Sequence, residues 1–473
     1  MNFILHLGLG SFHRAHQAVY VHQLHQLHQQ GQTEGMGWAI AGGNLRPDMA
    51  DTIAALQAQG GRYTLETVTP KGERSYTVIE SIQRVISYQD DLAPLIAAGA
   101  DSATRIISFT VTEAGYYLDA QNQLDWPTFA DLRADLAAVK AGQAGHTIYG
   151  GLISILRARM LAGAGPVTLM NCDNLRHNGD RSRSGLLQFI DALGDQALKA
   201  WVLENTSSPN AMVDRITPRP TPDVADRVRA ATGWDDKAAL MGESFIQWVI
   251  EDNFVADRPD WEKVGVEMVE SVQAYEEAKI RLLNATHSCI AWAGTLAGYQ
   301  YIHEGTHDAA IRQMAYDYVT DDAIPVLLPC PIDLEAYRDV VLDRFGNPAI
   351  ADTNQRVAMD AFSKIPGMIA PTIRDKLARN GSFDSVAMLP ALFLAYLQRW
   401  HAGQIPYTYH DQAMDPVVAH AICDAADPVA AYAADTTLWG EMASDPRLVA
   451  TLRNAFARVQ AFVAERAKAR SLV

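Results

Sequence analysis

Three polar side chains in a short apolar segment could carry out proton-transfer chemistry. Lys279, Asn284 and His287 lie in the stretch YEEAKIRLLNATHSCIAWAG, which is otherwise rich in isoleucine, leucine, alanine and tryptophan. At roughly 100° per residue, an α-helix places the three side chains within an arc of about 140°. Buried polar groups cost free energy unless they find partners. The segment therefore predicts one helical face that presents an amine, an amide and an imidazole.

The chain opens with an apolar run that ends in a Gly-x-Gly turn. The turn and the start of the next helix-like segment, which continues through Tyr20 and Leu27, are formed by Gly8, Leu9, Gly10, Ser11 and Phe12. This order is typical of a dinucleotide-binding βαβ unit. Gly8 would allow the tight turn, and Gly10 would let a pyrophosphate approach the N–H groups of the first helical turn. His13 stands where the third glycine is expected, so a plain strand-turn-helix remains the alternative.

Strand-like and helix-like segments alternate through the first half of the chain. The expected strands span residues 3–7, 37–41, 62–68, 75–81, 105–111 and 167–172, and the expected helices include 49–59, 129–139 and 148–161. Such alternation predicts an α/β domain with a mostly parallel, doubly wound, Rossmann-like sheet. The segments around residues 63–80, split by 70–72, are expected to form an added hairpin.

The second half is expected to be mostly α-helical. After a last strand at 266–272, amphipathic patterns dominate to the C-terminus. A chain of 473 residues exceeds the usual size of one core. We expect a dinucleotide-binding domain at 1–270 and a helical substrate and catalytic domain at 271–473. The apolar run at 388–397 contains Pro390 and is too short to span a membrane, so we expect a buried helix.

Composition narrows the function classes. A net charge of −16 argues against nucleic acid as a partner. The four cysteines are widely separated without a C-x-x-C pair, which indicates a reducing compartment. The first strand is expected to begin at the N-terminus, and we therefore expect no signal peptide. We expect a cytoplasmic protein with a small-molecule substrate and no membrane or nucleic-acid partner; its oligomeric state stays open, with a monomer among the options.

Taken together, the motifs resemble the polyol-specific long-chain dehydrogenases and reductases, the mannitol dehydrogenase family. Its members carry a Gly-x-Gly-x-Phe-His-Arg-Ala-His opening, matched by residues 8–16, and a Lys-x4-Asn-x2-His signature, matched by Lys279, Asn284 and His287. Further family-like stretches are 110–117, 171–174, 209–218 and 352–366. The resemblance spans almost the whole chain and is greatest to the D-arabinitol 4-dehydrogenases. It implies NAD-dependent, metal-independent oxidation of D-arabinitol to D-xylulose, with D-mannitol to D-fructose or reduction of a ketouronate as alternatives.

The chemistry of that reaction suggests a role for each polar residue. As hydride leaves a secondary alcohol, a base must take the hydroxyl proton. Lys279 is the candidate base, provided that desolvation lowers its pKa, and His287 would position the substrate or the amine. The developing alkoxide needs uncharged donors, for which we assign Asn284 and Asn174. The alternative is that Asp173 and Asn174 are simple turn formers.

The resemblance also implies a substrate pocket with further polar residues. It places Asp214, Arg356 and Lys364 there, where a polyol needs both donors and acceptors. Each could instead form a salt bridge between the domains. Glu276, one helical turn before Lys279, is expected to tune the base or move its proton, and the alternative is an ordinary ion pair on a solvated face.

The cofactor preference depends on residues after the second expected strand. A carboxylate there would bind the adenosine ribose and exclude NADP, and Asp48 is the candidate, slightly later than usual. Arg46 leaves NADP open, yet the pattern favours NAD. The resemblance adds Thr112 as a cofactor contact.

One motif suggests a different class, a zinc hydrolase. His303 to His307 read H-E-x-x-H, which binds zinc only when both histidines share a face of one helix. We expect Gly305 to interrupt that helix, with Thr306 and Asp308 capping a new one from Ala309 to Val319, so that the motif straddles a helix start. The run His22, His25 and His28 is likewise expected to be a solvated helix face. We therefore assign no metal site.

Overall fold

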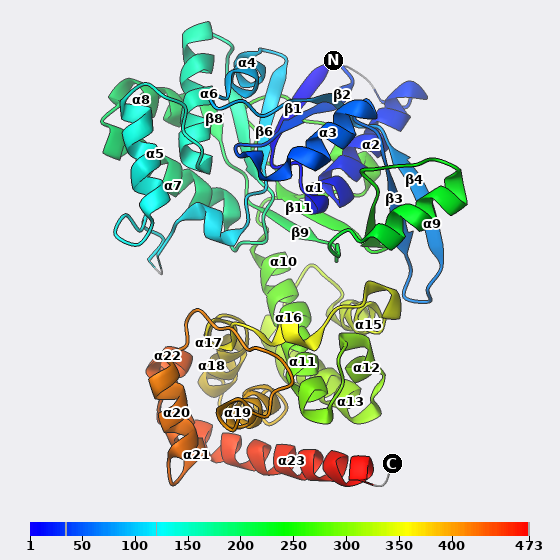
Figure 1. Cartoon of the computed structure of the whole chain (residues 1–473). Coiled ribbons are helices and arrows are strands. Elements are labelled where there is room, and N and C mark those ends of the chain that lie inside the picture. Colours follow the sequence, from blue (N-terminus) through cyan, green and yellow to red (C-terminus); the bar gives the residue numbers. More distant parts are fainter. Residues whose placement is uncertain (34–35, 120, 472–473) are drawn as a thin grey trace. The chain divides into compact units, whose positions relative to one another are not determined.

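The computed structural model describes residues 1–33, 36–119 and 121–471 (Figure 1). The chain divides into two compact units, Met1–Thr69 with Glu73–Gln273 and Pro70–Gly72 with Ala274–Val473. The first is α/β and the second is helical, as expected. The functional division at residue 270 stays a prediction.

The first unit is built on a six-stranded sheet whose neighbouring strands all run parallel. In spatial order its strands are β5 (Ile82–Val85), β2 (Trp38–Gly43), β1 (Asn2–Leu7), β6 (Thr104–Phe109), β7 (Val167–Asn171) and β8 (Thr206–Ser207). Strands β2 and β5 are added in turn on one side of β1, and strands β6, β7 and β8 are then added in turn on its other side. The doubly wound expectation is confirmed, and the switch point lies between β1 and β6.

Helices cover one face of this sheet, and helices together with strands of two smaller sheets cover the other, so its central strands are buried on both faces. Phe3, Leu5 and Leu7 of β1 pack into one core cluster and Ile4 into another, as alternation along a strand requires. The helices of the unit are α1 (Ser11–Ala15), α2 (Gln17–Gln29), α3 (Ala50–Ala58), α4 (Ala93–Ala100), α5 (Ala130–Lys140), α6 (Ile148–Ala162), α7 (Asn178–Leu193), α8 (Gln196–Asn205) and α9 (Pro222–Thr232).

Two smaller sheets complete the first unit. One consists of β10 (Leu240–Glu243), β3 (Tyr63–Val68) and β4 (Arg74–Ile79), and the other of β12 (Glu267–Val269), β11 (Gln247–Glu251) and β9 (Ala211–Asp214). The antiparallel pair β3 and β4 confirms the expected hairpin. Strands β5 and β8 to β11 were not predicted from the sequence.

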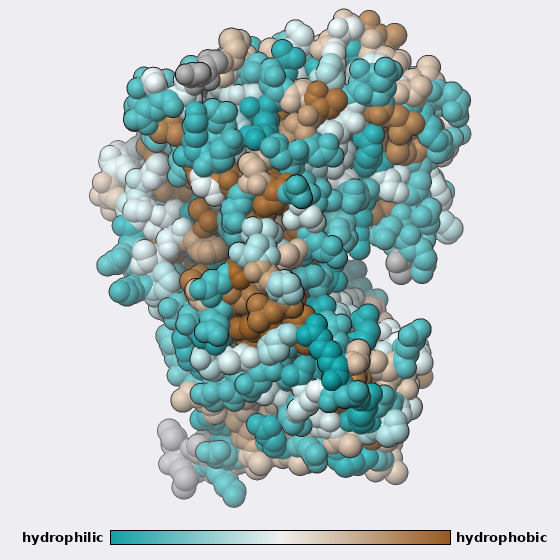
Figure 2. Space-filling view, turned by 180° about the vertical axis from the view of Figure 1, so that it is seen from behind, coloured by the Kyte–Doolittle hydropathy of each residue, from teal (hydrophilic) through white to brown (hydrophobic). Residues whose placement is uncertain are grey.

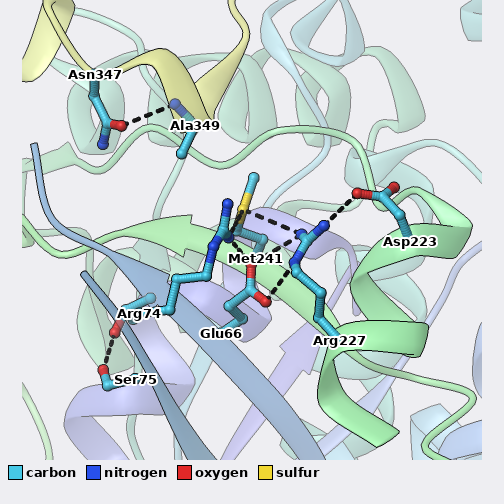
Figure 3. Close-up of polar contacts among 9 residues, drawn as sticks. Glu66, Arg74, Ser75, Asp223, Arg227, Met241, Asn347 and Ala349 are labelled. Carbon is cyan, nitrogen blue, oxygen red and sulfur yellow. Dashed lines mark hydrogen bonds and ion pairs between the residues drawn. The ribbon is translucent and has the colours of Figure 1, made fainter. Parts of the chain in front are cut away.

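A buried carboxylate ties the hairpin to helix α9 (Figure 3). Glu66 of β3 is fully buried, and Arg227 of α9 donates to its two oxygens over 2.8 and 2.9 Å. Arg74 of β4 pairs with the same carboxylate, and Arg227 also pairs with Asp223. A buried carboxylate needs such partners to remain charged, so this cluster is structural.

The second unit consists of helices, among which the described residues contain three π-helical turns. The helices are α10 (Gln273–Ala278), α11 (Ala285–Ala297), α12 (Ile302–His307), α13 (Ala309–Asp317), α14 (Ile324–Leu327), α15 (Leu334–Phe345), α16 (Asn354–Ala358), α17 (Ala361–Lys364), α18 (Ala370–Ala378), α19 (Met388–His401), α20 (Pro416–Asp424), α21 (Pro428–Ala433), α22 (Thr436–Trp439) and α23 (Pro446–Ser471). The π-turns span Lys279–Asn284, Tyr318–Ala323 and Ile365–Ile369.

Helix α19 confirms the buried helix expected at 388–397, since its residues from Met388 to Leu397 are all buried. Within the described ranges, no helix is long and apolar enough to cross a membrane. Figure 2 shows a largely hydrophilic surface on the face drawn, interrupted by smaller hydrophobic areas.

Candidate active site

A pocket of about 780 Å³ lies in the first unit at the carboxyl ends of β1, β2, β6 and β7. It therefore spans the switch point, where open α/β sheets bind their ligands. Most residues predicted to bind the cofactor line it, namely Gly8, Gly10, Ser11, Phe12, Asp48 and Thr112, and so does Asn174. Leu9 points its side chain into the core, while its backbone N–H donates to Asn44 Oδ1 over 2.8 Å.

The two glycines of the turn do different work. Gly8 has φ +107°, and a Cβ there would lie 2.2 Å from the carbonyl oxygen of Thr110. This position requires glycine both for its backbone conformation and for close approach. Gly10 has an ordinary φ of −77°, and a Cβ there would meet only the Gly8 oxygen, at 3.9 Å. Its missing side chain leaves room on the pocket side.

The helix after the turn is broken, which corrects the expectation of one continuous segment. Helix α1 ends at Ala15, and His16, with φ −124° and ψ −86°, separates it from α2. In place of the third glycine, the ring of His13 stacks on that of His6 in β1, with centroids 3.4 Å apart. A ring stack thus replaces the close helix-strand packing that glycine usually provides.

The residues after β2 form the rim expected to receive the ribose. Asp48 lies in a 3₁₀ turn, Pro47–Met49, and is exposed at the pocket. Arg46 also lines the pocket, but it donates to the Tyr117 hydroxyl over 2.9 Å and lies 3.6 Å from Asp131. Asp48 is thus exposed to the pocket, whereas the Arg46 side chain is hydrogen-bonded to Tyr117, a residue of the pocket wall.

Asp173 has a role that sequence reasoning missed. Its carboxylate accepts from the backbone N–H of Val111 over 2.8 Å and of Thr112 over 3.1 Å, and from the Tyr116 hydroxyl. Burial raises the pKa of Asp173, against the opposing effect of these donors. It holds Thr112 at φ +69° on the pocket wall. In the sequence, only its position directly before Asn174 drew attention to Asp173, and the alternative interpretation treated both residues as simple turn formers.

The segment carrying the predicted base is not a single α-helix, so the expectation of a regular α-helical face was wrong. Lys279 and Asn284 are the two ends of a π-helical turn, and His287 lies in α11. In a π-turn the hydrogen bonds join residues five apart. Lys279 and Asn284 therefore lie about one turn apart, closer to a common face than α-helical geometry would place them.

Lys279 and Glu276 are both buried, with 7% and 5% of their surfaces exposed. The solvated-face alternative for Glu276 is therefore wrong. Glu276 precedes Lys279 by three residues, about one helical turn, so a buried carboxyl group and a buried amine follow one another along this segment.

His287 belongs to a polar cluster within the second unit. Its Nε2 lies 3.3 Å from Asp352 Oδ2, and its ring stacks on Phe345 with centroids 4.3 Å apart. Arg356 binds the same aspartate, and its Nε donates to Oδ1 over 2.6 Å. Asp352 thus joins two predicted site residues, His287 and Arg356, although the sequence reasoning gave it no role.

In this cluster, burial and neighbouring positive charge shift the pKa of the central carboxylate in opposite directions. Burial would raise the pKa of Asp352, but His287 and Arg356 outweigh it and hold the value well below normal. Burial lowers the pKa of His287. Lys364 is also affected, because burial lowers its pKa to about 8 while its Nζ donates to the Val357 carbonyl over 2.6 Å.

Asp214 ends strand β9 of the first unit, where it is buried opposite Gln247 of β11. It does not line the pocket at the glycine turn. Its role in substrate binding stays a prediction.

The HEGTH motif lies within one short helix, α12, so the expectation that it straddles a helix start was wrong. Glu304 accepts from the Gln300 and Tyr301 backbones as a helix cap. Asp308 caps α13 as expected, but the Thr306 hydroxyl donates to Ile302 inside α12. The solvated-face expectation also fails for His22, which is buried and accepts from the Glu80 N–H over 3.2 Å.

The fold and pocket together define a class of protein, the Rossmann-type dehydrogenases with a helical second unit. The chain belongs to the mannitol dehydrogenase family. The mannitol dehydrogenase Rossmann domain matches residues 2–263, and the mannitol dehydrogenase C-terminal domain matches 271–460.

Curated relatives and solved structures narrow the family further. The chain is 58% identical to the D-arabinitol 4-dehydrogenase of Ralstonia nicotianae, covering 98% of this chain and 97% of that protein. It is 53% identical to that of Klebsiella pneumoniae, covering 97% and 98%. The Pseudomonas fluorescens mannitol 2-dehydrogenase ternary complex with NAD and D-mannitol has 33% identity and a TM-score of 0.80, covering 99% and 94%. A substrate-free D-sorbitol dehydrogenase has 31% identity and a TM-score of 0.85, covering 97% and 94%.

Proposed function

We propose that this protein oxidises D-arabinitol to D-xylulose with NAD as hydride acceptor. The observation that carries the proposal is the identity of 58% and 53% to two D-arabinitol 4-dehydrogenases over nearly the full length of each chain. Fold alone would not select a substrate, because one scaffold hosts many reactions.

The first unit fits NAD. Its pocket lies at the switch point of the sheet and combines a glycine turn with an exposed carboxylate, Asp48, for a ribose hydroxyl. The amide Nδ2 of Asn44 is buried in the pocket lining without a hydrogen-bond partner in the described part of the chain, and a bound ligand would supply an acceptor for it. The related Pseudomonas fluorescens enzyme was solved with NAD.

The chemistry needs one base and uncharged donors. Bound NAD would supply the hydride acceptor for the carbinol carbon. The amine of Lys279 would take the hydroxyl proton. Asn174 and Asn284 donate hydrogen bonds to the oxygen as it acquires negative charge. His287 and Arg356, both anchored by Asp352, orient the remaining hydroxyls together with Lys364 and Asp214. Glu276 lies close in sequence to Lys279 and receives or relays the proton.

The proposal assigns the enzyme to the cytoplasm. All four cysteines are free thiols, and Cys172 and Cys289 are buried, which suits a reducing compartment.

The test is a panel of pentitols, hexitols and uronates, each supplied with NAD or NADP and followed at the nicotinamide absorbance with a chelator present. The highest kcat/KM is expected for D-arabinitol with NAD, unaffected by the chelator. A preference for D-mannitol would move the enzyme to the mannitol 2-dehydrogenase branch, and activity on ketouronates alone would contradict polyol oxidation. Activity that disappears with the chelator would contradict a lysine base.

A further inference from the structure

His6 is fully buried in β1, two residues before the glycine turn, and both of its ring nitrogens have partners. Nε2 lies 3.1 Å from the carbonyl oxygen of Gly8 and 3.1 Å from the Thr110 hydroxyl oxygen. The carbonyl can only accept, and the hydroxyl donates to that same carbonyl, so Nε2 carries the proton. Nδ1 lies 2.8 Å from the Ser108 hydroxyl, which then donates to it. These two contacts select one neutral tautomer.

The Gly8 carbonyl that His6 contacts accepts several of the hydrogen bonds that hold the glycine turn. Gly8 O also accepts from the Thr110 hydroxyl over 3.0 Å and from the Gly10 N–H over 2.6 Å. Three donors from β1, from the loop after β6 and from the turn itself thus hold this one oxygen. Gly8, Gly10 and Thr110 all line the pocket, whereas His6 does not.

The His13 ring covers the other side of His6. The two rings are stacked with an interplanar angle of 12°. His13 Nδ1 lies 3.3 Å from Gln17 Oε1, and Gln17 Nε2 lies 2.9 Å from His16 Nδ1. His16 Nε2 in turn lies 2.7 Å from the Gln247 carbonyl. A buried chain of polar groups therefore runs behind the turn and joins β1 to β11.

Burial lowers the pKa of His6 to about 3, and burial also lowers that of His13. Both rings stay neutral at physiological pH. The Nε2–H of His6 therefore remains a donor to Gly8 without adding charge to the floor of the pocket.

We propose that His6 is a positioning residue for the dinucleotide: its Nε2–H holds the Gly8 carbonyl, and thereby the glycine turn, in the conformation that receives the pyrophosphate. The His6–His13 stack takes over the packing role of the missing third glycine. This inference rests on the proposed use of NAD and is independent of which polyol is oxidised.

The test measures NADH binding by nicotinamide fluorescence, without any polyol. His6→Gln and His6→Asn form a matched pair, because a glutamine amide reaches about as far as Nε2 and an asparagine amide only as far as Nδ1. Losing one hydrogen bond that orders the site is expected to raise the Kd about tenfold, so His6→Asn should bind NADH about tenfold more weakly and His6→Gln close to the wild type. Ser108→Ala, a milder change, removes the donor that fixes the tautomer and should weaken binding by a smaller factor.

A second buried histidine provides the control. His22 of α2 is also buried, and its Nδ1 accepts a backbone N–H away from the pocket. His22→Asn should lower the melting temperature without changing the Kd for NADH. An equal loss of NADH affinity in His6→Gln and His6→Asn would overturn the proposal, because altered packing alone would then explain it. An unchanged Kd in His6→Asn or in Ser108→Ala would also overturn it. A wild-type protein that binds no NADH would contradict the cofactor assignment instead, and inactivity toward polyols with normal NADH binding would contradict only the substrate.

Discussion

His287 and Asp352 face one another across 3.3 Å in the second unit, although 65 residues separate them in the chain. The aspartate is nearly buried and also binds Arg356, so one carboxylate orients an imidazole and a guanidinium. Neither the motif containing His287 nor the stretch containing Arg356 indicates this link by itself.

Asp352→Asn should therefore lower kcat/KM for the polyol. An unsatisfied buried group costs about 1–3 kcal/mol, which corresponds to roughly a 5- to 150-fold loss. Steady-state kinetics should show this loss with the Kd for NADH unchanged. Asp343→Asn is the matched control, because its exposed carboxylate pairs only with the exposed Arg312 among the ion pairs described. Equal kinetics in the two variants would show that Asp352 does not orient the site.

Lys279→Ala should abolish turnover while the protein still folds and binds NADH. A positioned general base contributes about 10²- to 10⁴-fold to the rate, so kcat should fall by at least the lower figure. Lys237→Ala, which removes an exposed lysine of the first unit, should leave kcat unchanged. Circular dichroism checks the fold of both. A Lys279→Ala enzyme that retains most of its turnover would eliminate this lysine as the base.

Gly8→Ala and Gly10→Ala should separate stability from cofactor binding. The first places a Cβ 2.2 Å from a backbone oxygen at φ +107°, where left-handed backbone alone costs about 1–2 kcal/mol. Urea unfolding should show a loss greater than this. Gly10→Ala should change stability by less than about 0.5 kcal/mol but weaken NADH binding, because it adds a methyl group to a residue that lines the pocket. The reverse order of stabilities would contradict the geometry of the turn.

Asp48→Ala should relax the preference for NAD. Removing one charge-assisted hydrogen bond to a ribose hydroxyl costs about 1.5–3 kcal/mol, and removing the carboxylate also ends its repulsion of a 2′-phosphate. The ratio of kcat/KM for NAD to that for NADP should fall by about tenfold or more. Asp51→Ala, at an exposed position of α3 outside the pocket lining, is the control. An unchanged ratio would mean that another residue reads the ribose.

Stability should fall as the pH drops from 7 to 5, because buried histidines stay neutral in the folded protein. Burial lowers the pKa of His6 from 6.5 to about 3, so over this window the unfolded chain binds more protons than the folded one. Linkage then predicts a loss that reaches about 2 kcal/mol at pH 5 for this group. His6→Gln should show a shallower pH dependence in urea unfolding than the wild type. Parallel curves for His6→Gln and the wild type would contradict a neutral His6.

Much of the fold follows from local patterns. Runs of buried β-branched and aliphatic residues predict β1, β6 and β7, and the 3.6-residue period predicts α3, α5 and α6 to within a few residues. The break at His16 was missed because both halves of the segment are helix-like, and the backbone dihedrals that interrupt it depend on packing rather than on the sequence around it.

The candidate site was predictable only in part. Gly8 and Gly10 were predicted from their spacing, and Asn174 was predicted from its position after an expected strand. Asp173 and Asp352 gave no such signal. Asp173 binds groups 57 to 62 residues away along the chain, and Asp352 meets His287 65 residues away, although its other partner, Arg356, is only four residues from it. The π-turn at Lys279 was also missed, since its residues have the composition of an ordinary helix.

The amino-acid sequence alone determined the alternation of strands and helices, the glycine turn and the residue types that can move a proton, because these depend on neighbours within a few positions. Only the tertiary structure decided which distant side chains meet. The His6–His13 stack, the hydrogen bonds of Asp173 to the pocket wall and the pairing of His287 with Asp352 all depend on how the chain packs, and no local period encodes that packing.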